Sequence, residues 1–223
     1  MTQAQYTAIW QRIAKHYSNE TAILGYDLLN EPIAHSFNHN KKLESVYKMA
    51  VTAIRKYDKN HIVLLGGAQW NSNFAVFTDW HFDKKMMYTC HIYGCDTVQS
   101  SIQNFVNFRN KVNLPMYMGE TGENKDEWIS AFHKLLEKNN IGWTYWPYKK
   151  IANTAGMVKI IAPQKWGLIV DYAKKDRSDF EKIRVARPVQ SEVLEAMDEL
   201  IINIKFENCS INHSYIKALG MNP

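Results

Sequence analysis

Two acidic residues end short, strand-like stretches of this chain. Glu31 follows the apolar run 23–29, which Pro32 closes, and Glu120 follows the run 115–119. Runs of this length and composition are typical of strands in a parallel sheet that is buried on both faces. An unpaired carboxylate is costly at such a place, but the carboxyl ends of strands in α/β barrels are where catalytic groups lie. We therefore predict catalytic carboxyl groups at Glu31 and Glu120; the alternative is a pair of ordinary strand-end charges neutralised by Arg or Lys.

His91 and Tyr93 form a second chemically active pair, at the end of the run 86–93. Residues two apart in a strand project to the same side, so both side chains can face the mouth of a barrel. A buried His can instead be a core residue with a satisfied hydrogen bond. The spacing and the position at a strand end favour a functional pair.

Five buried strands that alternate with helices must position these side chains. The expected strands are 23–29, 61–67, 86–93, 115–119 and 141–146, and the expected helices are 6–16, 41–57, 98–112, 128–136, 178–185 and 189–204. Alternation of this kind is typical of an α/β fold with a parallel sheet. We expect 148–165 to be a loop and the amphipathic pattern of 189–204 to reflect core packing. No internal repeat or Pro/Gly-rich linker is found, which favours one domain.

The order of these motifs resembles glycoside hydrolase family 5, the cellulase family built on a (β/α)8 barrel. The resemblance extends from about residue 6 to residue 146. It is carried by Asn30-Glu31-Pro32, His91-Ile-Tyr93, Pro115-Met-Tyr-Met-Gly-Glu120 and Gly142-Trp-Thr-Tyr-Trp146. These motifs look like the ends of the family's fourth, sixth, seventh and eighth strands. The resemblance implies an α/β fold, an incomplete TIM barrel with about five parallel strands, in a single family 5-like domain over residues 1–223 that is truncated at its N-terminal side.

The resemblance also implies an activity, the retaining cleavage of β-1,4-linked glucan by double displacement. Glu31 would be the acid/base and Glu120 the nucleophile, with their carboxyl groups about 5 to 5.5 Å apart. A Tyr93 hydroxyl that donates to Glu120 would favour the charged form of that residue. Asn30 would bind the sugar 2-hydroxyl, and His91 would shape the same subsite.

Aromatic residues are the expected sugar platforms. The chain has 13% aromatic residues, and aromatic rings stack on the flat C–H faces of sugars, although they also fill cores. Trp146 resembles the family's platform at the cleaved bond. Trp70 follows the strand 61–67 and is expected either to line the cleft or to pack under its loop.

Part of the family's active site has no counterpart in the sequence. The three strands that precede the Asn-Glu-Pro strand in the family supply an Arg and a His-containing segment, and five strands cannot close a barrel of eight. We therefore expect reduced activity, or, as an alternative, a catalytically inactive carbohydrate-binding or scaffold protein. Two bare strand edges would favour self-association, with two-fold symmetry, unless the chain is a truncated product.

Composition excludes several other classes of function. The chain of 223 residues has no apolar run long enough for a membrane span, and its first residues do not form a signal peptide. The compartment stays open; the family resemblance suggests a secreted or periplasmic protein. The net charge of +5 is spread along the chain, which argues against nucleic-acid binding.

Neither a metal nor another cofactor is expected. Cys90, Cys95 and Cys209 show no metal-ligand spacing, and their odd number gives no disulfide framework. The His residues that could bind a metal also lack ligand spacing. They are His35, His39, His81 and His91.

Overall fold

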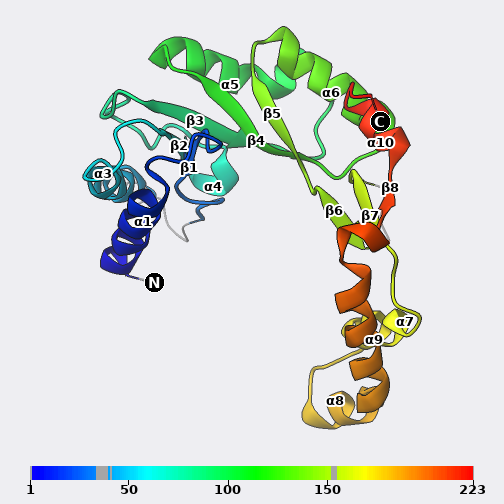
Figure 1. Ribbon diagram of the computed structural model, residues 1–223. Helices are drawn as coiled ribbons and strands as arrows, with labels where there is room; N and C mark the ends of the chain where they lie inside the picture. The colour runs from blue at the N-terminus through cyan, green and yellow to red at the C-terminus, as the bar shows by residue number, and fades with distance from the viewer. Residues whose placement is uncertain (1, 34–39, 41, 152–154, 223) are drawn as a thin grey trace. The chain divides into compact units, whose positions relative to one another are not determined.

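The computed structural model describes residues 2–33, 40, 42–151 and 155–222 of the chain (Figure 1). They form two compact units. The first consists of Met1–Gly122 and Ser130–Trp146, and the second of Glu123–Ile129 and Pro147–Pro223. All the predicted catalytic and substrate-binding residues belong to the first unit. The single domain over residues 1–223 stays a prediction.

The first unit is built on a curled sheet of five parallel strands, in agreement with the sequence-based expectation. The strands are β1 (Gly25–Asp27), β2 (Ile62–Gly66), β3 (Met86–His91), β4 (Met116–Gly122) and β5 (Gly142–Trp146), and they lie in the order β1-β2-β3-β4-β5. Because all neighbours are parallel, their carboxyl ends meet at one edge. The sheet is part of a TIM barrel, with helices between successive strands (Figure 1).

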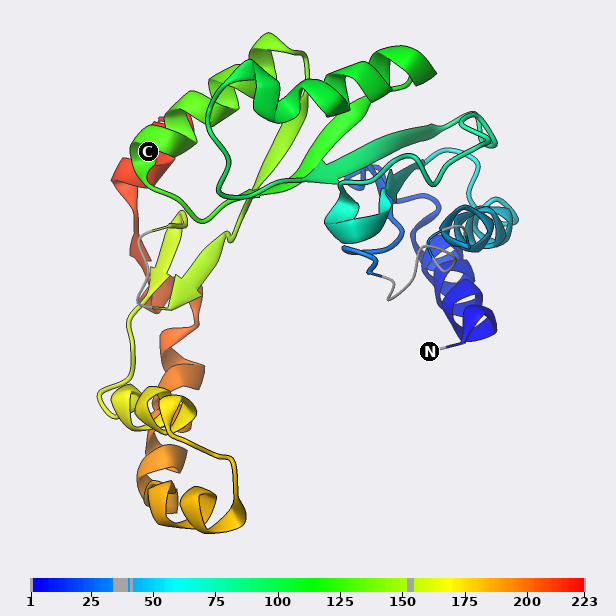
Figure 2. The ribbon, with the colours of Figure 1, turned by 180° about the vertical axis from the view of Figure 1, so that it is seen from behind.

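Helices cover the outer face of this sheet, as Figure 2 shows from behind. They are α1 (Gln3–Tyr17), α3 (Leu43–Ile54), α5 (Gln99–Val112) and α6 (Asp126–Lys138). Of α6, the part from Ser130 onward belongs to the first unit. Helix α1 begins with a capping box, in which the Thr2 hydroxyl accepts from the backbone of Gln5 and the Gln5 side chain accepts from the backbone of Thr2. Fully buried side chains between helices and sheet include Tyr47, Leu65, Ile102 and Met118.

Two register shifts distinguish the observed sheet from a regular one. One lies between Cys90 and His91 on β3, and the other between Met118 and Thr121 on β4. Strand β4 also continues to Gly122, so Glu120 lies within the strand and not after it as the sequence suggested. Such irregularities re-aim side chains next to active sites, and here they lie at the two strands that carry His91 and Glu120.

A buried polar cluster ties β1 to the segment that enters β2. The hydroxyl of Tyr26 donates to Asp58 at 2.7 Å, and Nδ1 of His61 lies 2.5 Å from the same carboxylate. Burial alone would raise the pKa of Asp58, but backbone N–H groups of His61 and Asn60 and the two side chains hydrogen-bond the charged form and lower it to about 2. These interactions fix the amino ends of the strands, opposite the predicted site.

The second unit corrects two expectations from the sequence. The segment 148–165 is not simply a loop, because β6 (Lys149–Ile151) and β7 (Val158–Ile160) pair in parallel and β7 pairs antiparallel with β8 (Ser210–Ile211). Core packing does not explain the apolar pattern of 189–204 either. Helix α9 (Gln190–Asn203) buries only Ala196 fully among its residues, whereas Leu194, Met197 and Ile201 are exposed.

The remaining elements of this unit are short. They are α7 (Trp166–Lys174), α8 (Phe180–Ala186), the 3-10 helix η1 (Phe206–Asn208) and α10 (His213–Ala218). Helix α8 begins at the cap residue Asp179, whose carboxylate accepts from the backbone of Lys182. Among all described helices of the chain, none is both long and apolar enough to cross a membrane.

Candidate active site

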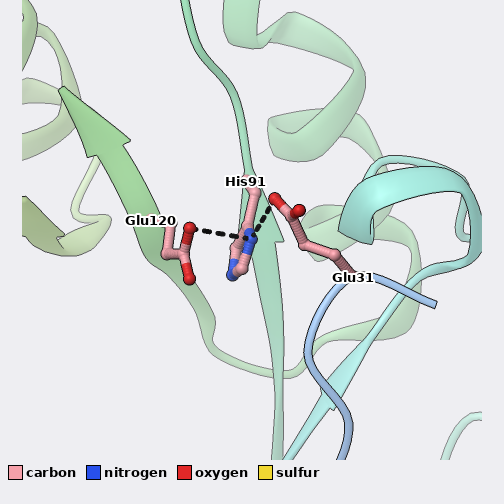
Figure 3. Close-up of side chains that lie close together, drawn as sticks. All are labelled: Glu31, His91 and Glu120. Carbon is pink, nitrogen blue, oxygen red and sulfur yellow. Dashed lines mark hydrogen bonds and ion pairs between the residues drawn. The ribbon is translucent and has the colours of Figure 1, made fainter. Parts of the chain in front are cut away.

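Hydrogen bonds from helix α1 hold the segment that leads from β1 to Glu31. The carbonyl of Leu28 accepts hydrogen bonds from the Tyr6 hydroxyl at 2.8 Å and from the Trp10 ring nitrogen at 3.1 Å. Three residues later the backbone turns, because Glu31 has a φ of 45°, which is uncommon for a residue with a side chain. Strained backbone of this kind is often found at functional sites. The turn directs the Glu31 carboxylate toward β3 (Figure 3).

His91 lies between the two predicted catalytic acids (Figure 3). Its Nδ1 atom is 3.0 Å from Oε1 of Glu31 and 3.8 Å from Oε2 of Glu120. The three contacting atoms all lie within 4.8 Å of one another, so the two carboxylates come together as the sequence predicted. His91 is only 5% exposed, whereas both carboxylates keep access to solvent.

Tyr93 holds Glu120 from the other side. Its hydroxyl donates to Oε2 of Glu120 at 2.8 Å, which confirms the predicted hydrogen bond. A hydrogen bond to an ionised acceptor is stronger than one between neutral groups and favours the charged carboxylate. The arrangement therefore fixes the orientation of the Glu120 carboxylate.

The other predicted residues lie at the same edge of the sheet but have exposed side chains. Asn30 precedes Glu31, Trp70 follows β2, and Trp146 is the last residue of β5. Trp70 and Trp146 are both about half exposed, at 54% and 52%. Exposed rings at the carboxyl ends of strands are available for stacking, and the sugar-binding roles of all three residues stay predictions.

Two residues of the site were missed by sequence reasoning. Asn71 is fully buried, and its Nδ2 atom is 3.2 Å from Nε2 of His91. Asp27 is the last residue of β1; desolvation raises its pKa to about 6, the charge of His91 lowers it, and the charge of Glu120 raises it further. The paired glycines at the end of β2 were the available signal for Asn71, since they indicate close approach of a neighbouring group.

The same cluster has the composition of a metal site. One imidazole nitrogen and two carboxylate oxygens, from Glu31, His91 and Glu120, are close enough to share an ion. Of the other candidate ligands, His81 is exposed, and His35 and His39 lie outside the described residues. A pair of carboxylates with a hydrogen-bonding His also suits acid–base chemistry without a metal. The expectation of a metal-free site stays a prediction.

A family model described as cellulase (glycosyl hydrolase family 5) matches residues 1–151. The chain belongs to glycosyl hydrolase family 5. Glu31, His91 and Glu120 all lie inside the matched region of this family 5 chain. The second unit lies outside it, apart from residues 123–129 and 147–151.

Curated relatives of this family 5 chain carry the names of polysaccharide- and glycoside-cleaving enzymes. An endoglucanase of Clostridium saccharobutylicum is 23% identical over 155 residues, which are 64% of this chain and 33% of the relative. A β-xylosidase of Phanerodontia chrysosporium is 28% identical over 141 residues, covering 61% of this chain and 28% of the relative. The chain thus spans about a third of the length of these relatives.

Solved structures similar to this family 5 chain include Thermotoga maritima Cel5A. Its complexes with mannotriose and with cellobiose are 21% and 22% identical to the chain, each with a TM-score of 0.58. The match covers 66% of this chain and 59% of Cel5A. The likeness establishes the fold of the first unit as part of a (β/α)8 barrel.

Proposed function

We propose that this family 5 chain is a retaining glycoside hydrolase of endo-β-1,4-glucanase type. The observation that carries the proposal is the approach of the Glu31 and Glu120 carboxylates, of which one oxygen each lies within 4.8 Å of the other. Retaining glycosidases keep their two carboxyl groups about 5 to 5.5 Å apart, whereas inverting ones leave about 6.5 to 9.5 Å for a water molecule. The short spacing supports direct attack by a carboxylate.

In the first step, Glu120 attacks the anomeric carbon while Glu31 gives its proton to the leaving oxygen. The C–O bond to the leaving group breaks as a glycosyl ester with Glu120 forms. In the second step, Glu31 takes a proton from water, the water oxygen attacks the anomeric carbon, and the ester to Glu120 breaks. The hydrogen bond from Tyr93 keeps the Glu120 carboxylate oriented for attack.

The substrate class is inferred from the relatives' names and from the exposed aromatic rings. Endoglucanases are prominent among the relatives, and Cel5A is in complex with cellobiose in one solved structure and with mannotriose in another. Trp146 and Trp70 would stack on sugar rings at the open edge of the sheet, and Asn30 would bind the 2-hydroxyl. A β-linked glucan fits this arrangement.

Substitution of the two acids tests the hydrolase proposal. Glu120→Gln keeps the shape of the side chain but removes the nucleophile, so release of reducing sugar from carboxymethylcellulose should fall at least about 10³-fold. A 2-fluoro glycoside should label Glu120 covalently, as peptide mapping by mass spectrometry would show. Lys138→Gln, at an exposed site away from the cluster, is the matched control and should keep full activity.

The main alternative is an inactive carbohydrate-binding protein. The exposed rings of Trp70 and Trp146 favour it, because they would bind glycans without any catalysis. Binding of cellohexaose by the wild type, with no sugar release and no labelling of Glu120, would replace the hydrolase proposal with this one. A metal-dependent hydrolase is tested in the same assay, since it would lose activity in EDTA.

Self-association is proposed as the means of covering the two edge strands. Within the described residues, β1 pairs only with β2 and β5 only with β4. Unpaired strand edges are templates for pairing with another chain. We expect a two-fold symmetric dimer in light scattering at micromolar concentration, and a monodisperse monomer with a cooperative thermal transition would argue against it.

A further inference from the structure

The buried Asn71 contacts the catalytic cluster but has no role in the two chemical steps. Its Nδ2 atom lies 3.2 Å from Nε2 of His91, and His91 in turn faces both carboxylates through Nδ1. We propose that Asn71 is a positioning residue that fixes the tautomer of His91 and thereby makes its Nδ1 a hydrogen-bond donor to Glu31. The catalytic consequence rests on the proposed function, but the tautomer itself does not.

The local backbone is arranged around the Asn71 side chain. Helical turn α4 (Ala68–Asn71) contains three successive residues with positive φ, Gln69 at 52°, Trp70 at 56° and Asn71 at 56°. Backbone hydrogen bonds of 2.9 and 2.8 Å between Ala68 and Asn73 close the turn. Left-handed residues with side chains are strained and persist only where surrounding contacts over-determine them. The strained turn places Asn71 inside and Trp70 outside.

Two glycines leave the space that the Asn71–His91 pair occupies. A Cβ atom at Gly66 would lie 2.3 Å from Oδ1 of Asn71. A Cβ atom at Gly119 would lie 3.1 Å from Nε2 of His91 and 2.3 Å from the Thr89 hydroxyl. The 2.3 Å distance to Asn71 and the 3.1 Å distance to His91 are both shorter than ordinary Cβ contacts. The pair therefore fits against glycines of two strands, β2 and β4, and is not an incidental surface contact.

The chemistry of the amide sets the direction of the hydrogen bonds. An amide nitrogen is a donor only, so Nε2 of His91 must be the acceptor, and a neutral imidazole with an accepting Nε2 carries its proton on Nδ1. The opposite amide orientation would demand the other tautomer, because Oδ1 would then face Nε2. Oδ1 of Asn71 has no hydrogen-bond partner among the described residues. The tautomer of His91 thus reports directly on the role of Asn71.

The donor at Nδ1 serves both chemical steps at Glu31, which lies 3.0 Å away. An Nδ1–H group cannot accept the proton of Glu31, so that proton remains for the leaving oxygen. When Glu31 becomes a carboxylate after proton transfer, the same N–H stabilises its charge. The other tautomer would offer a lone pair to the Glu31 proton and compete with the substrate for it.

Nitrogen NMR of protein labelled with 15N-histidine tests the proposal. At pH 7 we expect His91 to give a pyrrole-type Nδ1 signal and a pyridine-type Nε2 signal, assigned by their absence from the His91→Gln spectrum. A proton on Nε2, either in the other neutral tautomer or in an imidazolium, would overturn the proposal. This result would leave the hydrolase function untouched, since sugar release and labelling of Glu120 are measured separately.

Substitutions at Asn71 provide the second arm. Asn71→Asp replaces the donor with an acceptor, so the His91 proton should move to Nε2 and kcat should fall roughly 10- to 100-fold with little change in KM. Ser72→Ala is the matched control in the same turn, because the Ser72 hydroxyl donates to the Gln69 carbonyl and not to His91, and it should leave both signals and rate unchanged. An unchanged His91 tautomer in folded Asn71→Asp would also contradict the proposal, and should that variant not fold, the wild-type spectrum decides alone.

Discussion

At the scale of single residues, the site is a chain of hydrogen bonds that ends on two acids. Tyr93 donates to Glu120, while His91 lies between Glu120 and Glu31. Each acid therefore has a neighbour of a different kind, a phenol for the proposed nucleophile and an imidazole for the proposed acid/base.

Removal of the Tyr93 hydroxyl should weaken catalysis without unfolding the chain. Tyr93→Phe deletes a hydrogen bond to a charged group, a contribution of about 1.5 to 3 kcal/mol, so kcat should fall roughly 10- to 150-fold. Tyr57→Phe is the control, because it removes the hydroxyl of an exposed side chain outside the site. A Tyr93→Phe enzyme with wild-type kcat would mean that Glu120 does not need this donor.

At the scale of elements, strand ends and the glycines beside them decide which side chains meet. Because Gly66 and Gly119 have no Cβ atom, they leave space for the side chains of Asn71 and His91. The register shifts on β3 and β4 fall at the residues that carry His91 and Glu120. The amino ends of the strands are held by a different set of contacts around Asp58.

A side chain at Gly66 should damage the site from within β2. The new Cβ of Gly66→Ala would lie 2.3 Å from Oδ1 of Asn71, and overpacking of this kind costs about 1 to 3 kcal/mol of unfolding free energy. Gly167→Ala is the control, because a Cβ there meets nothing within 4 Å and Ala favours the helix it occupies. Urea unfolding of both variants checks the expectation; equal stabilities would contradict it.

The Asp58 cluster should make the first unit sensitive to acid. The folded-state pKa of about 2 lies below the ordinary Asp pKa of 3.8, so the stabilisation is complete above about pH 4 and is lost as the pH falls toward 2. The loss should be on the order of 2 kcal/mol. Asp58→Asn should flatten this part of the curve of unfolding free energy against pH, whereas Asp96→Asn, at an exposed carboxylate, should not.

At the scale of the whole chain, the two units differ in how much they bury. The first contains most of the largest fully buried side chains, such as Tyr47 and Leu136, and the second contributes Ile129 and Tyr215 to that group. Helix α9 leaves Leu194, Met197 and Ile201 exposed. A unit with few buried apolar side chains opens more easily, because local stability follows the burial of contacts.

Hydrogen exchange should reveal this difference. We expect backbone amides of α9 to exchange faster than those of β2 and β3, with protection factors lower by about 10²-fold or more. Mass spectrometry of peptic fragments after deuterium labelling measures both regions in one experiment. Equal protection of the two regions would mean that α9 is stabilised by contacts outside the described residues, including those of an oligomer.

The sequence alone determined the strand order, the family and the two acids. The strands depend on local patterns, since short apolar runs between amphipathic helices predict parallel strands. The family and the two acids follow from motifs at the ends of those strands that resemble glycoside hydrolase family 5. Even the hydrogen bond from Tyr93 to Glu120 followed from motif positions. Only the tertiary structure decided that Asn71 reaches His91, because that contact depends on a left-handed turn and on space above two glycines. It also decided that α9 is exposed, because an apolar helix pattern has no information about whether a neighbour covers it.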